Sequence, residues 1–502
     1  MSEQEYDIII IGSGMGGLGA GIQLQCTSPN LRTLIVEQHS IPGGYVSGFT
    51  RKGHYFDAGA EGATYVGEGE ILDKWFKEIG FSQEFIREKP LEVIHYPDRT
   101  ITLHDNLDDH IAELVKHFPH EKENIIAYFR YLEAMVNEYL PFAPDKYRKS
   151  FGNLLKFIVT SHKIRANMGK TFDKLLNKFI KDEQLKDVLS FFTLWLGMPV
   201  ENLSATSAGV LFGYVHIFGN HYAKGGMLSF SQNLADFYTS KGGKIRYKTV
   251  VKKIIVENKE VKGVQLADDT IIKGKWVISN ADLKRTIFDY VEEENLPKKY
   301  VQKINRTKQS LSGVSVFLIT SQDLSSFPSH MTVKKEYRDY IGEVLQGNFT
   351  ADQVCIRIPS NIDHSLRKQG QTAVILLALA PYEWENNWKT LDGKERQEEY
   401  KKLKEQCGKD LIATAERAIP KLSSTLEYVE VSTPLTFERY TLSTDGSWYG
   451  PRRNQKKIKY KTPIPNLVFA GGNVVRGGVP NCLLSGIKTA NYIAKVIGKN
   501  RE

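Results

Sequence analysis

The hydrophobic pattern of the chain begins with a short apolar run that ends in glycines. Residues 8–11 are all Ile, which is typical of a strand buried on both faces of a parallel sheet. The glycine motif 12–17 (GSGMGG) follows, and the small residues of 18–25 predict a helix. A second apolar run, 33–36, ends in Glu37. The pattern predicts a strand–turn–helix–strand unit with an acid at its tip.

This unit has the features of a dinucleotide-binding turn. Gly12 permits the tight turn, Gly14 lets backbone N–H groups approach a pyrophosphate, and Gly17 lets the helix pack close to the strand. The helix N-terminus offers N–H donors and partial positive charge to phosphates. Glu37 lies 25 residues after Gly12, close to the spacing expected for a carboxylate that holds a ribose hydroxyl. A glycine-rich structural turn is the weaker interpretation, because all parts of the unit are present.

Further apolar runs predict the elements that follow. Residues 92–103 predict a hairpin within a mainly helical stretch from 71 to 138. A helix over 228–240 precedes a β-meander of strands 244–247, 250–256, 261–266 and 270–272, and the strand 276–280 returns to the core. Later elements are strands at 313–320 and 372–380, a charged helix from 394 to 419, a strand at 466–469 and a final helix at 482–497. This order indicates a two-domain flavoprotein rather than a simple dehydrogenase.

Length and composition narrow the class of protein. The chain has 502 residues, of which 41% are hydrophobic, so more than one domain is expected. The four cysteines are scattered, which argues against a disulfide framework or a metal site and suits a reducing compartment. The N-terminus has the acidic Glu3, Glu5 and Asp7, so we expect no secretory signal. The apolar runs are too short to span a bilayer.

The net charge of +9 is concentrated in one region. Residues 144–181 contain ten Lys and Arg but only two Asp, which gives +8 locally. Two amphipathic patterns lie within this region, at 151–158 and 172–179. Two interpretations are open: solvated helices that pack inward, or a patch that lies on an anionic membrane with lysines at the headgroups. Binding of nucleic acid is not expected, because no nucleic-acid-binding motif is nearby.

The motifs at the two ends and in the middle resemble one enzyme family. They are the N-terminal unit with Gly43-Gly44 and the 56–59 motif (FDAG), the sequence 225–227 (GGM), and the C-terminal 469–473 (FAGGN) with 477–480 (GGVP). Together they are similar to the FAD-dependent polyene oxidoreductases: phytoene desaturases, carotenoid isomerases and retinol saturases. Residues 36–39 (VEQH) look more like the saturase and isomerase branch, and 477–480 more like the desaturases. Little of 65–215 or 285–430 matches.

The resemblance implies a fold class and a division of the chain. We expect an α/β protein with a Rossmann-like FAD-binding domain, made of a parallel sheet and a β-meander, and an interleaved α+β substrate domain. The FAD-binding parts are 1–65, 216–282 and 441–502. A helical insert, membrane-associating in one interpretation, spans 66–215, and the substrate domain spans 283–440.

The resemblance also implies the cofactor contacts. FAD would bind extended, with its pyrophosphate on the 12–17 loop and its adenosine ribose on Glu37. Many members have Asp where this chain has Asn473, so that contact would lack a charge. The implied FAD-binding residues are Gly12, Ser13, Gly14, Met15, Gly16, Gly17, Glu37, Gln38, Gly44, Tyr45, Val251, Gly472, Asn473, Val479 and Pro480.

The expected chemistry is hydride transfer between the flavin and an allylic carbon of a lipophilic isoprenoid substrate. The sequence has no Ser-His-Asp order, no HExxH and no phosphoryl-transfer loop. Glu61, His221, Tyr222 and Arg476 are candidate catalytic residues, although a structural role is the stronger interpretation of each. We expect a cytoplasmic enzyme, peripheral on the membrane.

Two alternative functions share this architecture. A flavin amine oxidase usually has Arg after the Gly-Gly pair, where this chain has Tyr45. A prenyl-lipid escort protein would bind lipid without flavin turnover, and it would not need the intact Gly12, Gly14, Gly17 and Glu37.

Overall fold

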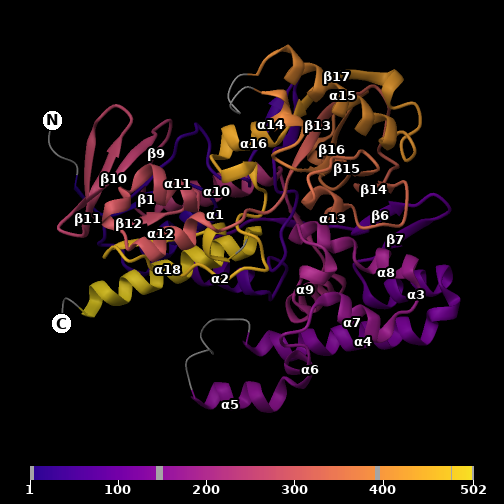
Figure 1. Cartoon of the computed structure of the whole chain (residues 1–502), viewed down its shortest axis with the longest axis horizontal. Helices are drawn as coiled ribbons and strands as arrows, with labels where there is room; N and C mark the ends of the chain where they lie inside the picture. Colours follow the sequence, from indigo (N-terminus) through magenta and orange to yellow (C-terminus); the bar gives the residue numbers. More distant parts are fainter. Residues whose placement is uncertain (1–4, 143–150, 391–395, 476, 500–502) are drawn as a thin grey trace. The chain divides into compact units, whose positions relative to one another are not determined.

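The computed structural model describes residues 5–142, 151–390, 396–475 and 477–499 (Figure 1). The chain divides into two compact units. The first contains Met1–Phe85, Tyr222–Ser312 and Pro434–Glu502, and the second contains Ile86–His221 and Gly313–Thr433. The five-part division expected from the sequence is finer than this one and stays a prediction.

The first unit is built on a mixed sheet with strand order β10, β11, β12, β1, β2 and β9, and with β18 beside β12. Its centre is parallel and apolar, since Ile8, Ile9 and Ile10 are fully buried. The strands are β1 (Glu5–Ile11), β2 (Thr33–Val36), β9 (Lys244–Arg246), β10 (Val251–Glu257), β11 (Glu260–Leu266), β12 (Ile271–Ser279) and β18 (Leu467–Phe469). The smaller pair β3 (Gly48–Arg51) and β4 (His54–Asp57) belongs to the same unit. The α/β fold class is confirmed.

Two details of the expected meander are wrong. Strand β9 pairs in parallel with β2 and not with β10, because it follows the crossover helix α10 (Met227–Ser240). The strands expected at 270–272 and 276–280 form one continuous strand, β12. Lys273 pairs with both Gly263 of β11 and Glu5 of β1, so the chain continues straight from the meander into the parallel sheet.

Two helices of the first unit pack closely against each other. Helix α1 (Met15–Thr27) contacts α18 (Val479–Lys499), and a Cβ atom added at Gly486 would lie 2.1 Å from the backbone oxygen of Gly16. Only glycine fits here, so helix α18 is fixed against the 12–17 turn. Other helices of the unit are α2 (Ile71–Ile79), α11 (Leu283–Arg285), α12 (Lys298–Asn305), α16 (Pro434–Thr441) and α17 (Gly472–Val475).

The second unit has its own sheet, with strand order β17, β13, β16, β15, β14, β6 and β7. The predicted hairpin at 92–103 is confirmed as the antiparallel pair β6–β7. The strands are β6 (Glu92–His95), β7 (Thr100–Leu103), β13 (Ser312–Thr320), β14 (His330–Lys334), β15 (Gln353–Arg357), β16 (Thr372–Ala380) and β17 (Leu426–Ser432). The first two boundaries between the units fall within two short strands, β5 (Phe85–Arg87) and β8 (His221–Ala223).

Several helices of the second unit, among them α4, α7 and α9, contribute to an apolar cluster that includes Phe129, Phe172 and Phe212. Helix α7 (Phe172–Phe179) buries Phe172, Leu175 and Leu176, so the 172–179 pattern is an inward-packing face. The remaining helices are α3 (Leu107–His117), α4 (Lys122–Tyr139), α5 (Phe151–Thr160), α6 (His162–Ala166), α8 (Glu183–Leu189), α9 (Ala205–Phe218), α13 (Tyr340–Leu345), α14 (Glu385–Lys389) and α15 (Glu398–Ala415). Within the described residues, none of the helices has the length and apolar character that a bilayer crossing requires.

Candidate functional site

The turn after β1 holds the carboxylate of Glu37. The backbone N–H and the hydroxyl of Ser13 donate to Glu37 Oε2 at 2.8 and 2.6 Å, and the backbone N–H of His39 donates to Oε1 at 2.9 Å. Glu37 is 6% exposed at the end of β2. The parallel pairing of β1 and β2 therefore brings the acid and the glycine turn together, as the sequence predicts.

Helix α1 begins directly at this turn. Its N-cap is Gly14, which has no side chain with which to bond the first-turn N–H groups, and no acidic residue lies in that turn. Gly12 has a φ of +90°, a conformation that other residues rarely adopt. The first-turn N–H groups, which no side chain caps, and the helix dipole favour an anionic group at this end, with Met15, Gly16 and Gly17 in the first turn.

Asn280 lies at the centre of the glycine turn. A Cβ atom added at Gly14 would lie 2.8 Å from Asn280 Nδ2, and one added at Gly471 would lie 2.2 Å from Asn280 Oδ1. The backbone N–H of Asn280 donates to the oxygen of Ile11, which fixes it at the end of β12 beside β1. Asn280 is not among the residues predicted from the sequence, although its position directly after a core strand was visible there.

The C-terminal motif joins the same site. The N–H of Gly471 donates to the hydroxyl of Ser485 at 2.9 Å. The side-chain amide of Asn473 accepts from the N–H of Leu283 at 3.1 Å and donates to the oxygen of Ala281. Asn473 therefore bonds the protein backbone with both ends of its amide. Gly472 precedes it in α17, Val479 and Pro480 begin α18 as buried residues, and Arg476 lies outside the described residues.

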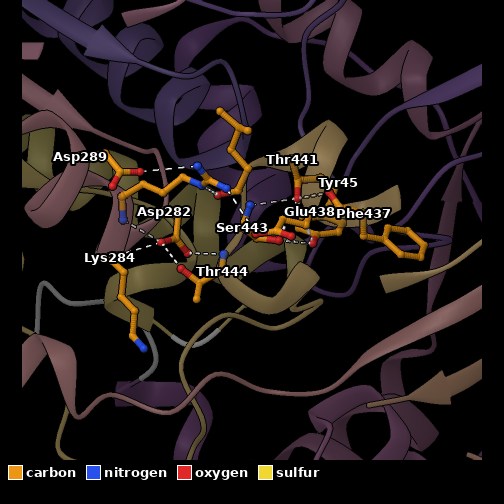
Figure 2. A network of polar contacts seen from close by, with 11 residues as sticks. Tyr45, Asp282, Lys284, Asp289, Phe437, Glu438, Thr441, Ser443 and Thr444 are labelled. Atoms are coloured by element: carbon orange, nitrogen blue, oxygen red, sulfur yellow. Dashed lines mark hydrogen bonds and ion pairs between the residues drawn. The ribbon is translucent and has the colours of Figure 1, made fainter. Parts of the chain in front are cut away.

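Tyr45 is fixed by a network of polar contacts, shown in Figure 2. Its hydroxyl donates to the backbone oxygen of Ser447 at 2.8 Å and lies 2.8 Å from the hydroxyl of Ser443. Its ring stacks on Phe437, and burial raises the pKa of its hydroxyl to about 12. Gly44 before it has a φ of +61°. Tyr45 is thus a neutral, oriented side chain at a position expected near the flavin.

The same network ties the segment 441–447 to helix α11. Asp282 accepts from the N–H of Thr444 at 3.1 Å and from its hydroxyl at 2.7 Å. Arg285 donates to the backbone oxygen of Leu442 at 2.7 Å. The sequence alone does not indicate these contacts, because partners about 160 positions apart leave no local signal.

Asp57 is a buried residue of the first unit that accepts several hydrogen bonds. Its carboxylate accepts from the hydroxyls of Tyr55 and Tyr222, each at 2.6 Å, and from the N–H of Met227 at 3.0 Å. Burial and the neighbouring Asp57 raise the pKa of Tyr55. The role of Tyr222 is therefore to hold the start of α10 against the Asp57 motif.

The other sequence-predicted residues are distributed over both units. Val251 begins β10, next to a turn in which the N–H groups of Lys248 and Thr249 donate to the backbone oxygens of His39 and Glu37. Gln38 donates to the oxygen of Tyr440 at 3.2 Å. Glu61 is half-buried in the first unit. His221 is buried and is the last residue of the first segment of the second unit.

The residues of the turn fit the groups of FAD. N–H groups that no side chain caps suit a pyrophosphate, and the oriented Glu37 carboxylate suits a ribose hydroxyl. The glycines leave a cradle that a Cβ would fill at Gly14.

Comparison with known proteins shows the family. Residues 15–494 match the family described as flavin containing amine oxidoreductase. The chain belongs to this family. Prolycopene isomerase of Arabidopsis thaliana is 29% identical and aligns with 100% of this chain and 84% of its own length. All-trans-retinol 13,14-reductase of Danio rerio is 25% identical, and the alignment covers 98% of this chain and 86% of the reductase. A neurosporene-forming phytoene desaturase of Cereibacter sphaeroides is 25% identical, and the alignment covers 97% of this chain and 94% of the desaturase.

Solved structures show the same fold at lower identity. An oxidoreductase from Methanosarcina mazei has a TM-score of 0.66 at 16% identity, covering 97% of this chain and 100% of its own. A mutant putrescine oxidase with redesigned cofactor binding has a TM-score of 0.65 at 14% identity, with 99% of each chain covered. A Rab GDI from Plasmodium falciparum has a TM-score of 0.56 at 12% identity, with 98% and 99% covered.

As a flavin containing amine oxidoreductase, the protein is an FAD-dependent oxidoreductase. When bound, FAD supplies hydride transfer. The residues that would hold it are those of the 12–17 turn, whose N–H groups would donate to the phosphates, and Glu37, whose oriented carboxylate would accept from a ribose hydroxyl. Asn280 lies between this turn and Gly471.

Proposed function

We propose that the protein transfers hydride between FAD and a lipophilic isoprenoid polyene, so that a carbon–carbon double bond is formed, reduced or isomerised. The single observation that carries this proposal is the alignment over 97–100% of the chain with proteins named for such polyenes. These alignments include the regions 65–215 and 285–430, where substrate choice would be made.

The residue after the Gly-Gly pair supports a polyene rather than an amine. Tyr45 is neutral, and its hydroxyl is occupied by Ser443 and Ser447. The intact Gly12 turn and the held Glu37 favour an enzyme over an escort protein, because lipid carriage needs neither.

The test is anaerobic flavin spectroscopy. We would mix the purified holoenzyme with liposomes that contain phytoene and record the oxidised flavin band together with the polyene spectrum. Bleaching with a longer polyene spectrum establishes desaturation. If the band is unchanged, the holoenzyme is reduced beforehand and given prolycopene or retinol in liposomes, and product is measured. Absence of product from phytoene with oxidised flavin, and from both prolycopene and retinol with reduced flavin, would overturn the proposal.

We also propose that the substrate is drawn from an anionic membrane through the 156–170 surface. This surface is defined by the exposed apolar Ile158, Val159 and Met168 and the exposed basic Lys156, Arg165 and Lys170. Val159 and Met168 are 64% and 63% exposed. Apolar side chains beside lysines are the pattern of an interfacial helix. Within the basic region 144–181, residues 144–150 lie outside the described residues.

A further inference from the structure

The carboxyl ends of three neighbouring parallel strands form one edge of the sheet in the first unit. Strands β1, β12 and β18 lie side by side, and the last residue of each is buried. Several of the residues that follow are only half-buried, and we call them the open edge: Gly12, Gly14, Asn280, Gly472 and Asn473. Ligands of open α/β sheets bind outside the carboxyl ends of the strands. Asn280 and Asn473 are the two members of the open edge that have polar side chains.

Asn280 presents an unbonded amide at the open edge. Its backbone N–H donates to the oxygen of Ile11 at 3.0 Å, which fixes its main chain beside β1. Its side-chain amide, by contrast, has no hydrogen-bond partner among the residues that the structure describes. The hydroxyl of Ser13 in the same turn is already occupied, since it donates to Glu37. A half-buried amide without a protein partner is available to a ligand.

Three glycines leave the space that the Asn280 amide occupies. A Cβ atom added at Gly14 would lie 2.8 Å from Nδ2, and one added at Gly16 or Gly471 would lie 2.4 or 2.2 Å from Oδ1. The donor end of the amide therefore lies beside Gly14, the N-cap of α1. The helix dipole and the first-turn N–H groups favour an anion at that cap. The amide thus places a further donor on the side where the phosphates of FAD are expected.

Asn473 fixes the backbone directly after Asn280. Its side-chain oxygen accepts from the N–H of Leu283 at 3.1 Å, and its side-chain N–H donates to the oxygen of Ala281. A carboxylate at position 473 would accept the first of these hydrogen bonds but would have no proton to donate in the second. The amide of Asn473 is therefore used to hold 281–283, and the amide of Asn280 is the one left for the cofactor.

We propose that the side-chain amide of Asn280 donates a hydrogen bond to the pyrophosphate of FAD, and that Asn473 is its positioning residue. Donors then approach the phosphates from the ends of two different strands: the first-turn N–H groups of α1 after β1, and Asn280 after β12. Hydrogen bonds to a charged acceptor are among the stronger ones. The inference concerns the cofactor alone, so its test uses no polyene and its outcome is independent of the substrate.

Replacement of Asn280 tests the contact with the phosphates. The apoproteins are titrated with FAD, followed by quenching of flavin fluorescence, and with ADP and adenosine, followed by ligand-detected NMR. N280A should bind FAD and ADP about tenfold more weakly but adenosine as tightly as the wild type, because adenosine has no phosphate. N280D, which keeps the shape of the side chain, should lose about a hundredfold for FAD and ADP, since its carboxylate repels the pyrophosphate.

The matched control is N305D, which adds the same charge at the exposed Asn305 of α12 in the same unit and should bind all three ligands like the wild type. Wild-type affinity of N280A for FAD would overturn the proposal. An equal loss for ADP and adenosine would also overturn it, because it would show that Asn280 only maintains the shape of the turn.

The phosphorus NMR spectrum of the holoenzyme gives a readout that does not depend on affinity. At least one resonance of the bound FAD pyrophosphate should shift in N280A, because a hydrogen bond to a phosphate oxygen is removed, and none should shift in N305D. Unshifted resonances in N280A would show that the amide does not contact the phosphates.

The role of Asn473 is tested by combining substitutions. N473D should weaken FAD binding about tenfold in the wild-type background but only slightly in N280A, since Asn473 acts through Asn280. A tenfold loss in both backgrounds would show that Asn473 acts on FAD independently of Asn280, and its positioning role would be wrong.

Discussion

The hydroxyl of Ser13 donates to the carboxylate of Glu37 at 2.6 Å, across 24 residues of sequence and between two parallel strands. The backbone N–H of Ser13 donates to the same oxygen at 2.8 Å. The second residue of the glycine motif thus orients the acid that would hold the ribose. In the 12–17 motif, the side chain of Ser13 thus has a structural role in addition to that of the glycines.

Replacing Ser13 by Ala should weaken FAD binding. The change removes one hydrogen bond to a charged group, worth about 1.5 kcal/mol, which corresponds to roughly tenfold in affinity. Titration of the apoprotein with FAD, followed by quenching of flavin fluorescence, measures the effect. S240A is the control, since the exposed Ser240 on α10 bonds only the backbone oxygen of Phe237. Equal affinities in the two variants would contradict an orienting role.

Replacing Gly14 by Ala should remove FAD with little effect on folding. The added Cβ would lie 2.8 Å from Asn280 Nδ2, the end of a side chain that can move, and the φ of Gly14, −64°, suits Ala. The methyl group would, however, occupy the space through which the pyrophosphate approaches the first-turn N–H groups. We expect at least about a tenfold loss of affinity. Full flavin content in purified G14A would show that the turn does not bind the phosphates.

Replacing Gly486 by Ala should destabilise the first unit. The added Cβ would lie 2.1 Å from the oxygen of Gly16 and 2.6 Å from the nitrogen of Ala20, both backbone atoms that cannot move alone. Forcing α1 and α18 apart should cost about 2 kcal/mol or more in the free energy of unfolding, measured by urea denaturation. G498A, later on the same helix and with open space, should instead gain about 0.5 kcal/mol. An unchanged midpoint in G486A would refute the close crossing.

The sequence predicted the parts of the site that local pattern determines. The run of Ile before Gly12 and the acid after 33–36 define the turn, because strand, helix and glycine signals are all local. Asn280 could not be found in this way, since its position in the site depends on the pairing of β12 with β1. These two strands are far apart in the sequence. The placement of β9 failed for the same reason: pairing partners are set by the crossover, not by the strand's own residues.

The basic region shows a second limit of prediction from sequence. The patterns at 151–158 and 172–179 have the same period, yet Phe172 is fully buried while Ile158 is 41% exposed. Periodicity identifies an amphipathic helix but not what covers its apolar face. The buried contact between Glu88 and His330 was equally hidden, because the two residues lie far apart in the sequence.

Acid should destabilise the second unit through two stacked histidines. His110 and His216 stack at 4.0 Å between ring centroids, and burial lowers the pKa of both, that of His216 from 6.5 to about 4. The unfolded chain therefore binds more protons between these values, so stability is complete above about pH 6.5 and is lost as the pH falls towards 4. The loss from His216 is on the order of 3 kcal/mol.

Urea unfolding at several pH values in this window measures that loss. An H216F variant should show a smaller dependence of the unfolding free energy on pH, because the unfolded chain has one proton fewer to bind. H162Q is the control, since His162 on α6 is exposed. An identical pH dependence in H216F and the wild type would contradict the assignment.

Binding to anionic vesicles should depend on Val159 and Met168 of the 156–170 surface. Replacing both by Asp removes two exposed apolar side chains and adds two negative charges beside Arg165 and Lys170. The loss should be at least about 2 kcal/mol, or roughly thirtyfold in the partition constant, measured by vesicle sedimentation. V429D is the matched control, because Val429 on β17 is 46% exposed but lies outside this surface. Added salt should weaken wild-type binding, since the lysine contribution is screened. Equal sedimentation of V159D/M168D and V429D would show that the protein does not meet the membrane through this surface.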